Sequence, residues 1–161
     1  MGIGVVSNLH LNQNDSIHIL KKEADEQIKY ILFRMSLRIL NEIEGYNGQC
    51  FIKLNHLIIK AKALSLENEK NTFFSKSNDY QYIKMREHQS QVLQEMYKVI
   101  NRLNTTPITS KIISDLILKI SIEYNEKNDC ILLLKEFDSI HLKLKEERLP
   151  VTRKEFEDRA R

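Results

Sequence analysis

The chain has 161 residues, of which 25 are Lys or Arg and 22 are Asp or Glu, so its formal net charge is +3. This length allows one domain with a sizeable core, and a content of only four glycines and two prolines disfavours a turn-rich β architecture. Because the two signs of charge are interleaved, the chain lacks the basic stripe that nucleic-acid binders present. We therefore predict an all-α domain with no nucleic-acid partner.

The first fourteen residues, MGIGVVSNLHLNQN, begin apolar and become polar, and we predict a connector over residues 1–14. Asp15 or Ser16 can cap a first helix over residues 15–41. Apolar side chains spaced three or four residues apart predict its buried face: Ile17, Leu20, Ala24, Ile28, Ile31 and Met35. The sequence G-Y-N-G at residues 45–48 should break the helix. Every apolar run of the chain is far shorter than the ~18 residues of a transmembrane helix.

Two further helices are predicted over residues 49–71 and 80–103. On the earlier of the two, one face carries Cys50, Leu54, Leu57, Ala61 and Leu64. The later helix has the most regular pattern in the chain, alternating steps of three and four residues. Its predicted core residues are Tyr82, Met85, Gln89, Val92, Met96, Val99 and Leu103, flanked by Leu93 and Ile100. A helix with so regular a pattern should lie at the centre of the fold.

A fourth helix should start with Thr106 as N-cap and Pro107 at its first position, and run to about residue 126. Its β-branched residues would also suit a strand, but its length and spacing decide for a helix. A fifth helix is predicted over residues 129–148. Its apolar positions also alternate steps of three and four: Cys130, Leu133, Phe137, Ile140 and Leu144.

Pro150 ends the fifth helix, and Thr152 with Glu155 forms the capping box of a short C-terminal helical stub. Short connections place consecutive helices side by side. The sequence therefore predicts an antiparallel bundle of about five amphipathic helices plus this stub, all within one domain over residues 15–161.

The residues that could carry chemistry are scattered along the chain. The five histidines, at positions 10, 18, 56, 88 and 141, lack the spacing of a metal site. Cys50 and Cys130 stand alone and are interpreted as small buried residues. The sequence also lacks a nucleophile elbow and a glycine-rich phosphate loop. We expect no enzyme activity, no metal and no cofactor.

One polar cluster is the best candidate for a site. Gln89 occupies a predicted core position, and Arg86 lies one turn earlier. A buried amide without partners costs about 1–3 kcal/mol, and a buried arginine needs a carboxylate. Glu155 and Glu157 are the candidate carboxylates, with Arg153 beside them. We favour a buried polar network that fixes the register of the helices, and a ligand pocket is the alternative.

Two blocks of sequence resemble a known family. The first is Y-x-x-M-R-x-x-Q-x-x-x-L-x-x-M, starting at Tyr82, and the second is L-P-V-T-R-K-E-F-E-D-R-A, starting at Leu149. A weaker match, E-Y-N-E-K-N, starts at Glu123. With the order of the helices, these blocks are similar to the C-terminal domain of the bacterial putative aromatic acid exporter family over nearly the whole chain.

The resemblance implies a soluble domain on the cytoplasmic side of the membrane, preceded by an N-terminal membrane domain of several spans. Residues 2–9, GIGVVSNL, are similar to the exit of the last span. The implied role is structural, assembly-related or regulatory, and the implied partner is the membrane domain. A sensing domain for aromatic carboxylates and a free-standing helical adaptor are the alternatives. The family supplies no catalytic residue to carry over.

After the second block, family members continue with an apolar segment that lengthens the last helix, whereas this chain ends at Arg161. We therefore expect a domain truncated in its C-terminal helix. We also expect an exposed apolar groove where the remainder of that helix would lie, which would favour dimerisation.

Overall fold

The computed structural model describes residues 2–44, 48–71, 78–102 and 106–125, and shorter stretches at 135–136, 138–140 and 142–143. For residues 2–12 and 71 it describes the backbone alone. The elements are α1 (Gly2–Ile39), α2 (Gln49–Asn71), α3 (Asp79–Arg102) and α4 (Pro107–Glu123), and the described residues contain no strand. The all-α prediction is confirmed. The short stretches are helical and fall within the predicted fifth helix, whereas the C-terminal stub lies outside the described residues.

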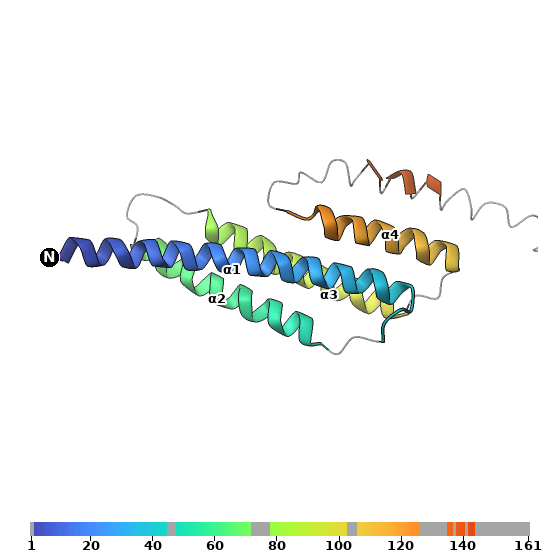
Figure 1. Ribbon diagram of the computed structural model, residues 1–161, viewed down its shortest axis with the longest axis horizontal. Helices are drawn as coiled ribbons and strands as arrows, with labels where there is room; N and C mark the ends of the chain where they lie inside the picture. The colour runs from blue at the N-terminus through green and yellow to red at the C-terminus, as the bar shows by residue number, and fades with distance from the viewer. Residues whose placement is uncertain are drawn as a thin grey trace, which may run out of the picture.

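α1 is the central element of the fold. It packs against α2, α3 and α4, and α2 also packs against α3. The backbones of α3 and α4 do not contact each other, although both lie on α1. Figure 1 shows the four helices side by side with alternating direction, and the amino end of α1 reaches beyond the other three. The prediction that the third helix is central was therefore wrong.

The predicted start of the first helix was also wrong, because α1 begins at Gly2 rather than after Asp15 or Ser16. A capping residue permits a helix to start but does not force it, and the polar residues before it only weakly disfavour helix. The other end has a clear local cause. Asn41 adopts a φ of 57°, its N–H donates to the carbonyl of Arg38, and the N–H of Glu42 donates to that of Leu37. This pattern is a Schellman motif, which satisfies the last carbonyls of the helix.

The remaining helix boundaries agree closely with the sequence prediction. α2 has the predicted bounds, and α3 begins and ends one residue earlier than expected. Thr106 is the N-cap of α4, and its hydroxyl accepts a hydrogen bond from the N–H of Thr109 at 3.3 Å. Pro107 follows as the first helical residue, where its missing N–H carries no penalty.

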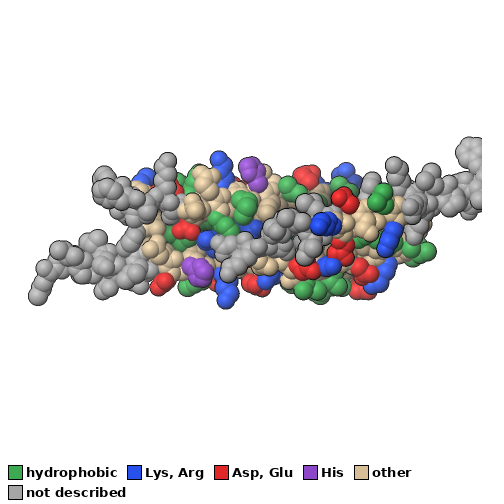
Figure 2. Space-filling model, turned by 90° about the horizontal axis from the view of Figure 1, so that it is seen from above, with side chains coloured by type: hydrophobic (Ala, Val, Ile, Leu, Met, Phe, Trp, Pro, Cys, Tyr) green, Lys and Arg blue, Asp and Glu red, His purple; other side chains and the backbone are tan. Residues whose placement is uncertain are grey.

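Among the described residues, α1 contributes the largest share of the core, and α2 and α3 contribute equal shares. The predicted buried faces of α1 and α2 are confirmed, with Leu20, Cys50, Leu57 and Leu64 only partly buried. Among the described residues, the large apolar side chains that are almost completely buried are Ile17, Ile28, Ile31, Met35 and Leu54. At the surface, side chains of both charge signs are mixed along the face seen in Figure 2, as the interleaved sequence predicts.

The buried face of α3 differs from the predicted one. Met85, Val92 and Val99 are 42%, 59% and 58% exposed. The buried positions are Ile83, Arg86, Ser90, Leu93, Tyr97 and Ile100. Both the predicted face and the observed buried face of α3 show steps of three and four residues. The observed face contains the polar residues Arg86 and Ser90, so its sequence is less apolar than that of the predicted face. Leu103 lies outside the described residues.

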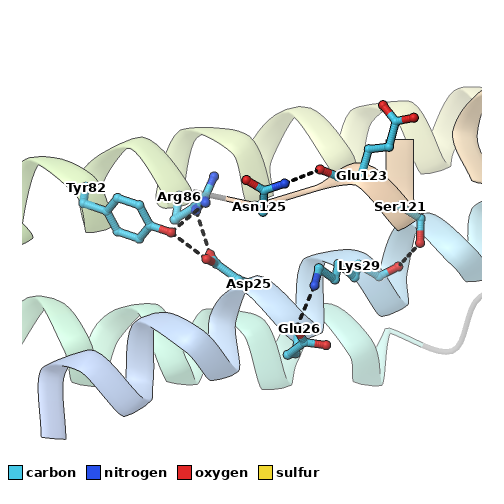
Figure 3. Close-up of polar contacts among 8 residues, drawn as sticks. All are labelled: Asp25, Glu26, Lys29, Tyr82, Arg86, Ser121, Glu123 and Asn125. Atoms are coloured by element: carbon cyan, nitrogen blue, oxygen red, sulfur yellow. Dashed lines mark hydrogen bonds and ion pairs between the residues drawn. The ribbon is translucent and has the colours of Figure 1, made fainter. Parts of the chain in front are cut away.

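Two buried serines fix α4 on α1. The hydroxyl of Ser114 donates to the carbonyl of Ser36 at 2.9 Å, and the hydroxyl of Ser121 donates to the carbonyl of Lys29 at 3.1 Å (Figure 3 shows the second bond). Serine is small enough for two helix backbones to approach closely, and its hydroxyl finds a partner there. The seam between α1 and α4 is thus polar at two points.

Candidate functional site

The guanidinium of Arg86 lies inside the bundle and donates three hydrogen bonds. Arg86 is only 4% exposed. Its Nε donates to Oδ1 of Asp25 on α1 at 2.8 Å, and its two Nη atoms donate to Gln89 Oε1 at 2.8 Å and to Tyr82 Oη at 2.6 Å. Each nitrogen of the buried cation therefore has an oxygen partner, which offsets much of the cost of removing the charge from water.

Asp25 is held from two directions. Arg86 binds one of its oxygens, and the hydroxyl of Tyr82 donates to the other at 2.6 Å. Because Tyr82 also accepts a bond from Arg86, the three side chains form a closed ring of hydrogen bonds between α1 and α3 (Figure 3). In such a ring each group polarises the next, so the bonds support one another.

Tyr124, the residue after α4, joins the same network. Its hydroxyl donates to Gln89 Oε1 at 2.9 Å, so Gln89 accepts bonds from both Tyr124 and Arg86. The rings of Tyr82 and Tyr124 each have their centroid 4.6 Å from Cζ of Arg86, within the range of cation–π attraction. We call Asp25, Tyr82, Arg86, Gln89 and Tyr124 the arginine cluster. It connects α1, α3 and the end of α4.

Their surroundings fix the protonation states of Tyr82 and Arg86. Burial raises the pKa of Tyr82 far above its ordinary value, and its hydrogen bond to Asp25 raises it further, so the phenol stays neutral. Burial alone would lower the pKa of Arg86, but Tyr124, Asp25 and Tyr82 outweigh this effect and the pKa is raised. A general acid or base works best with a pKa near the operating pH. The arrangement is therefore suited to holding helices together and poorly suited to proton transfer.

The structure brings together part of the candidate site predicted from the sequence. Arg86 and Gln89 are hydrogen-bonded, although Gln89 is half-buried rather than a core residue. Arg153, Glu155 and Glu157 lie outside the described residues. The carboxylate bound to Arg86 is Asp25, which the sequence prediction missed. The sequence did offer one signal for Asp25: it directly follows Ala24, which belongs to the predicted buried face of the first helix.

An apolar groove runs beside the arginine cluster, between α3 and α4 and over α1. One cleft of about 690 Å³ lies next to Gln89 and Tyr124, with Ile28 and Leu32 of α1 among its lining residues. A second cleft of about 530 Å³ shares Val92 and Met96 with the first. We call the two together the α3–α4 groove. Its remaining lining residues include Lys84, Met85, His88, Glu95, Val99, Ile113, Ile117 and Ile120.

Other kinds of site have less support in the part of the chain that the structure describes. No three His, Cys, Asp or Glu side chains gather there closely enough to hold a metal ion. Cys50 is a free thiol and is partly buried. Cys130 lies outside the described residues.

The profile of the putative aromatic acid exporter C-terminal domain matches residues 14–161. The chain belongs to this family. It is 24% identical to the "Uncharacterized protein YqjA" of Bacillus subtilis (strain 168) over 162 residues, which cover 99% of the chain and 50% of that protein. The chain thus spans about half the length of this curated relative. No solved structure matches the chain.

The structure explains the first sequence block of this exporter domain. The block's Tyr82, Arg86 and Gln89 all belong to the arginine cluster. Its apolar members Met85, Leu93 and Met96 line the α3–α4 groove. In the described residues of the exporter domain, no helix has both the length and the apolar character needed to cross a membrane.

Proposed function

We propose that this domain is a non-catalytic helical module on the cytoplasmic side of an exporter, where it acts in assembly or regulation of a membrane domain. The arginine cluster carries this proposal. Its buried ion pair joins α1 to α3, and Tyr124 adds the end of α4. The polar residues of the first sequence block thereby help to set the relative positions of three helices, as a packing module requires.

The shape of α1 supports the same role. This helix is the centre of the bundle and also reaches beyond it at its amino end (Figure 1). The family match and a relative of twice the length suit a second domain in the complete protein. Because α1 forms the centre of the bundle and also protrudes from it, a displacement of the second domain would be transmitted through α1 into the bundle.

The test uses the full-length exporter of which this domain forms the C-terminal part. Arg86→Leu removes the cation from the arginine cluster, whereas Lys98→Ala removes a cation from an exposed pair with Glu95 on the same helix. We expect Arg86→Leu to lower assembly of the exporter, measured by its size in detergent, and efflux of aromatic acids. Lys98→Ala should leave both unchanged.

Normal assembly and efflux in the Arg86→Leu exporter would contradict the proposal, provided that the variant accumulates to the same level in the membrane. If Arg86→Leu abolishes efflux and the purified parent domain is found to turn over a substrate, the claim that the domain is non-catalytic is contradicted.

A second candidate function is the sensing of an aromatic carboxylate, and the α3–α4 groove is the observation that favours it. Its larger cleft, about 690 Å³, is mostly apolar and includes Met85, Met96 and the ring of Tyr124. Small-molecule sites commonly combine such a lining with a few polar groups. Because Arg86 is already paired with Asp25, Lys84 and His88 are the better partners for a carboxylate there.

Thermal unfolding with benzoate-type acids at millimolar concentration tests this second function. We expect a rise in the unfolding midpoint, because a ligand that binds only the folded state stabilises it. Met96→Trp fills the cleft and should abolish the rise, whereas Ile59→Trp on the exposed face of α2 should keep it. An unchanged midpoint for the parent chain would remove this function.

A further inference from the structure

We propose that a cleft between the carboxyl-terminal half of α1 and the first turn of α2 binds a phosphate group, either as free phosphate or as a monoester. The inference stands independently of the proposed function. Among the described residues, the lining of this cleft shares none with the arginine cluster or the α3–α4 groove. The proposal rests on two cations without an anionic partner, on a buried acceptor, and on the charge around the cleft.

The cleft has a volume of about 450 Å³ and a polar lining, unlike the mostly apolar α3–α4 groove. It forms where α1 and α2, neighbouring helices of opposite direction, lie side by side (Figure 1). Small-molecule sites typically have volumes of about 300–1,000 Å³, so a phosphate group with a small organic remainder fits. We call it the α1–α2 cleft. Its lining residues are Gln27, Tyr30 and Arg34 of α1 and Gln49, Cys50 and Lys53 of α2.

Arg34 contributes a guanidinium that has no anionic partner in the described part of the chain. Its Nη1 donates to Oη of Tyr30 at 3.4 Å, and its Cζ lies 5.8 Å from the centroid of the Tyr30 ring. These contacts hold the side chain beside the cleft but use only one of its five N–H donors. A guanidinium with unused parallel donors suits an oxygen-rich anion, because it can donate two bonds to two oxygens.

Lys53 supplies a second cation from the facing helix. No carboxylate of the described residues pairs with its ammonium, whereas Lys21 and Lys62 each have such a partner. Two like charges that line one cleft repel each other, so a dianion bound between them removes this repulsion and is attracted to both. A lysine ammonium is also a common point-charge partner of phosphate groups.

Gln27 adds a hydrogen-bond acceptor to the cleft. It is only 7% exposed, and its Nε2 donates to the carbonyl of Cys50 at 3.0 Å. Its Oε1 accepts no hydrogen bond from the described residues and is not sealed from solvent, so it is open to the cleft. Monohydrogen phosphate carries a proton for this acceptor, and a monoester can offer a hydroxyl, whereas an ionised carboxylate group offers no donor. Two cations and one acceptor therefore favour phosphate over a simple carboxylate.

The surroundings of the α1–α2 cleft are basic, in contrast to the mixed charge of the chain as a whole. Residues 27–39 of α1 contain three basic residues and no acidic one, and so do residues 49–66 of α2. The acidic residue just before the first of these stretches, Glu26, is already paired with Lys29. The amino end of α2 adds the partial positive charge of a helix start. Along both helices, the charge near the cleft therefore attracts an anion.

Amide NMR spectra of the full 161-residue chain test the site directly. Inorganic phosphate and glycerol 3-phosphate are titrated separately, at fixed ionic strength with chloride as the other anion. We expect saturable shifts that are largest for the side-chain amide of Gln27 and the backbone amides of residues 49–53, and none for Met96 in the α3–α4 groove. Tighter binding of glycerol 3-phosphate would assign the site to a monoester, and equal binding would assign it to free phosphate.

Two double variants give a matched comparison. Arg34→Gln with Lys53→Gln removes both cations of the cleft, whereas Lys22→Gln with Lys60→Gln removes two exposed cations from the same helices outside it. The first should weaken phosphate binding by roughly tenfold or more, because each hydrogen bond to a charged group contributes about 1.5–3 kcal/mol. The second should weaken it less than about twofold, since salt screens exposed charges at a distance. Circular dichroism checks that both variants fold.

Several outcomes would overturn the proposal. Shifts that grow linearly with phosphate concentration would show charge screening only, and saturable shifts centred outside the cleft would place the anion elsewhere. Unchanged affinity in the folded Arg34→Gln, Lys53→Gln chain would show that these cations do not hold it. Sulfate, which carries no proton at neutral pH, should bind several-fold more weakly than phosphate. Equally tight binding of sulfate would contradict the preference for phosphate that Gln27 supports.

Discussion

Arg86 on α3 and Asp25 on α1 form a buried ion pair, 2.8 Å between Nε and Oδ1, across 61 positions of sequence. Tyr82 and Gln89 bind the guanidinium as well, but they are neutral. The pair therefore joins α3 to α1 together with the ion pair between Lys21 and Asp79, and its removal tests the importance of the whole arginine cluster.

Arg86→Leu should destabilise the domain by about 1–3 kcal/mol, because the variant leaves the partly buried Asp25 carboxylate without its cation. Urea unfolding followed by circular dichroism measures this change. The double variant with Asp25→Leu should regain much of the stability, since both charges are then gone. Lys98→Leu is the exposed control on α3. A loss below ~1 kcal/mol for Arg86→Leu would show that the ion pair contributes little.

The stability of the domain should fall at alkaline pH. The pKa of Tyr82 is raised in the folded state by burial and by its bond to Asp25, and burial also raises the pKa of Tyr97. A group with a raised folded pKa stabilises the fold fully below its unfolded pKa, about 10 for tyrosine, and this contribution is lost as pH rises through the folded pKa. Unfolding free energies measured from pH 8 to pH 11 should therefore decrease most at the upper end.

Tyr82→Phe provides the control for the alkaline effect. It should reduce the slope of stability against pH but leave a remainder due to Tyr97. Ultraviolet titration of tyrosinate should show that Tyr82 ionises only when the domain unfolds. If the phenol of Tyr82 titrates at an ordinary pKa in the folded domain, the network geometry around it is wrong.

The serine contacts between α4 and α1 predict small, similar losses of stability. Ser114→Ala and Ser121→Ala each remove one side-chain hydrogen bond to a carbonyl of α1, which typically contributes about 0.5–1.5 kcal/mol. Ser114→Leu should cost more, because a larger side chain forces the backbones apart. Ser139→Ala, at an exposed position, should have no effect. Equal stability of all four variants would mean that the seam is not closely packed.

Truncating a side chain at the centre of the core should greatly lower the free energy of unfolding. Met35 on α1 is fully buried, so Met35→Ala should destabilise the domain by about 2–5 kcal/mol through lost burial and a cavity. Ile59 on α2 is 63% exposed, and Ile59→Ala should stay within about 0.5 kcal/mol. Thermal unfolding of the two variants side by side measures the contrast. A similar effect of both changes would place the core elsewhere.

Local signals in the sequence predicted most helix boundaries. Thr106 and Pro107 start α4 because the cap and the fixed φ act within a few residues. The same kind of signal at Asp15 failed, since a possible cap inside a favourable helix does not interrupt it. The all-α class followed from composition and spacing alone, which are properties of the whole chain.

The missed parts of the site depend on contacts far apart in the chain. The core face of α3 contains Arg86 and Ser90, whose partners Asp25 and Asn55 lie on other helices. Without knowledge of those partners, the face with Met85 and Val92 had the stronger apolar pattern. Nothing in the local sequence distinguishes a polar residue that finds a buried partner from one that faces solvent.

The 38 residues of α1 give it a length of ~57 Å at 1.5 Å per residue. Among its residues with described side chains, the first core residue is Ile17, and the amino end of the helix reaches beyond the other three helices (Figure 1). Each residue of a helix turns the chain by ~100°, so inserting a single residue between positions 2 and 12 would rotate whatever is attached at the amino end by that angle relative to the bundle. The length of α1 therefore determines both the orientation and the distance of an attached part relative to the bundle.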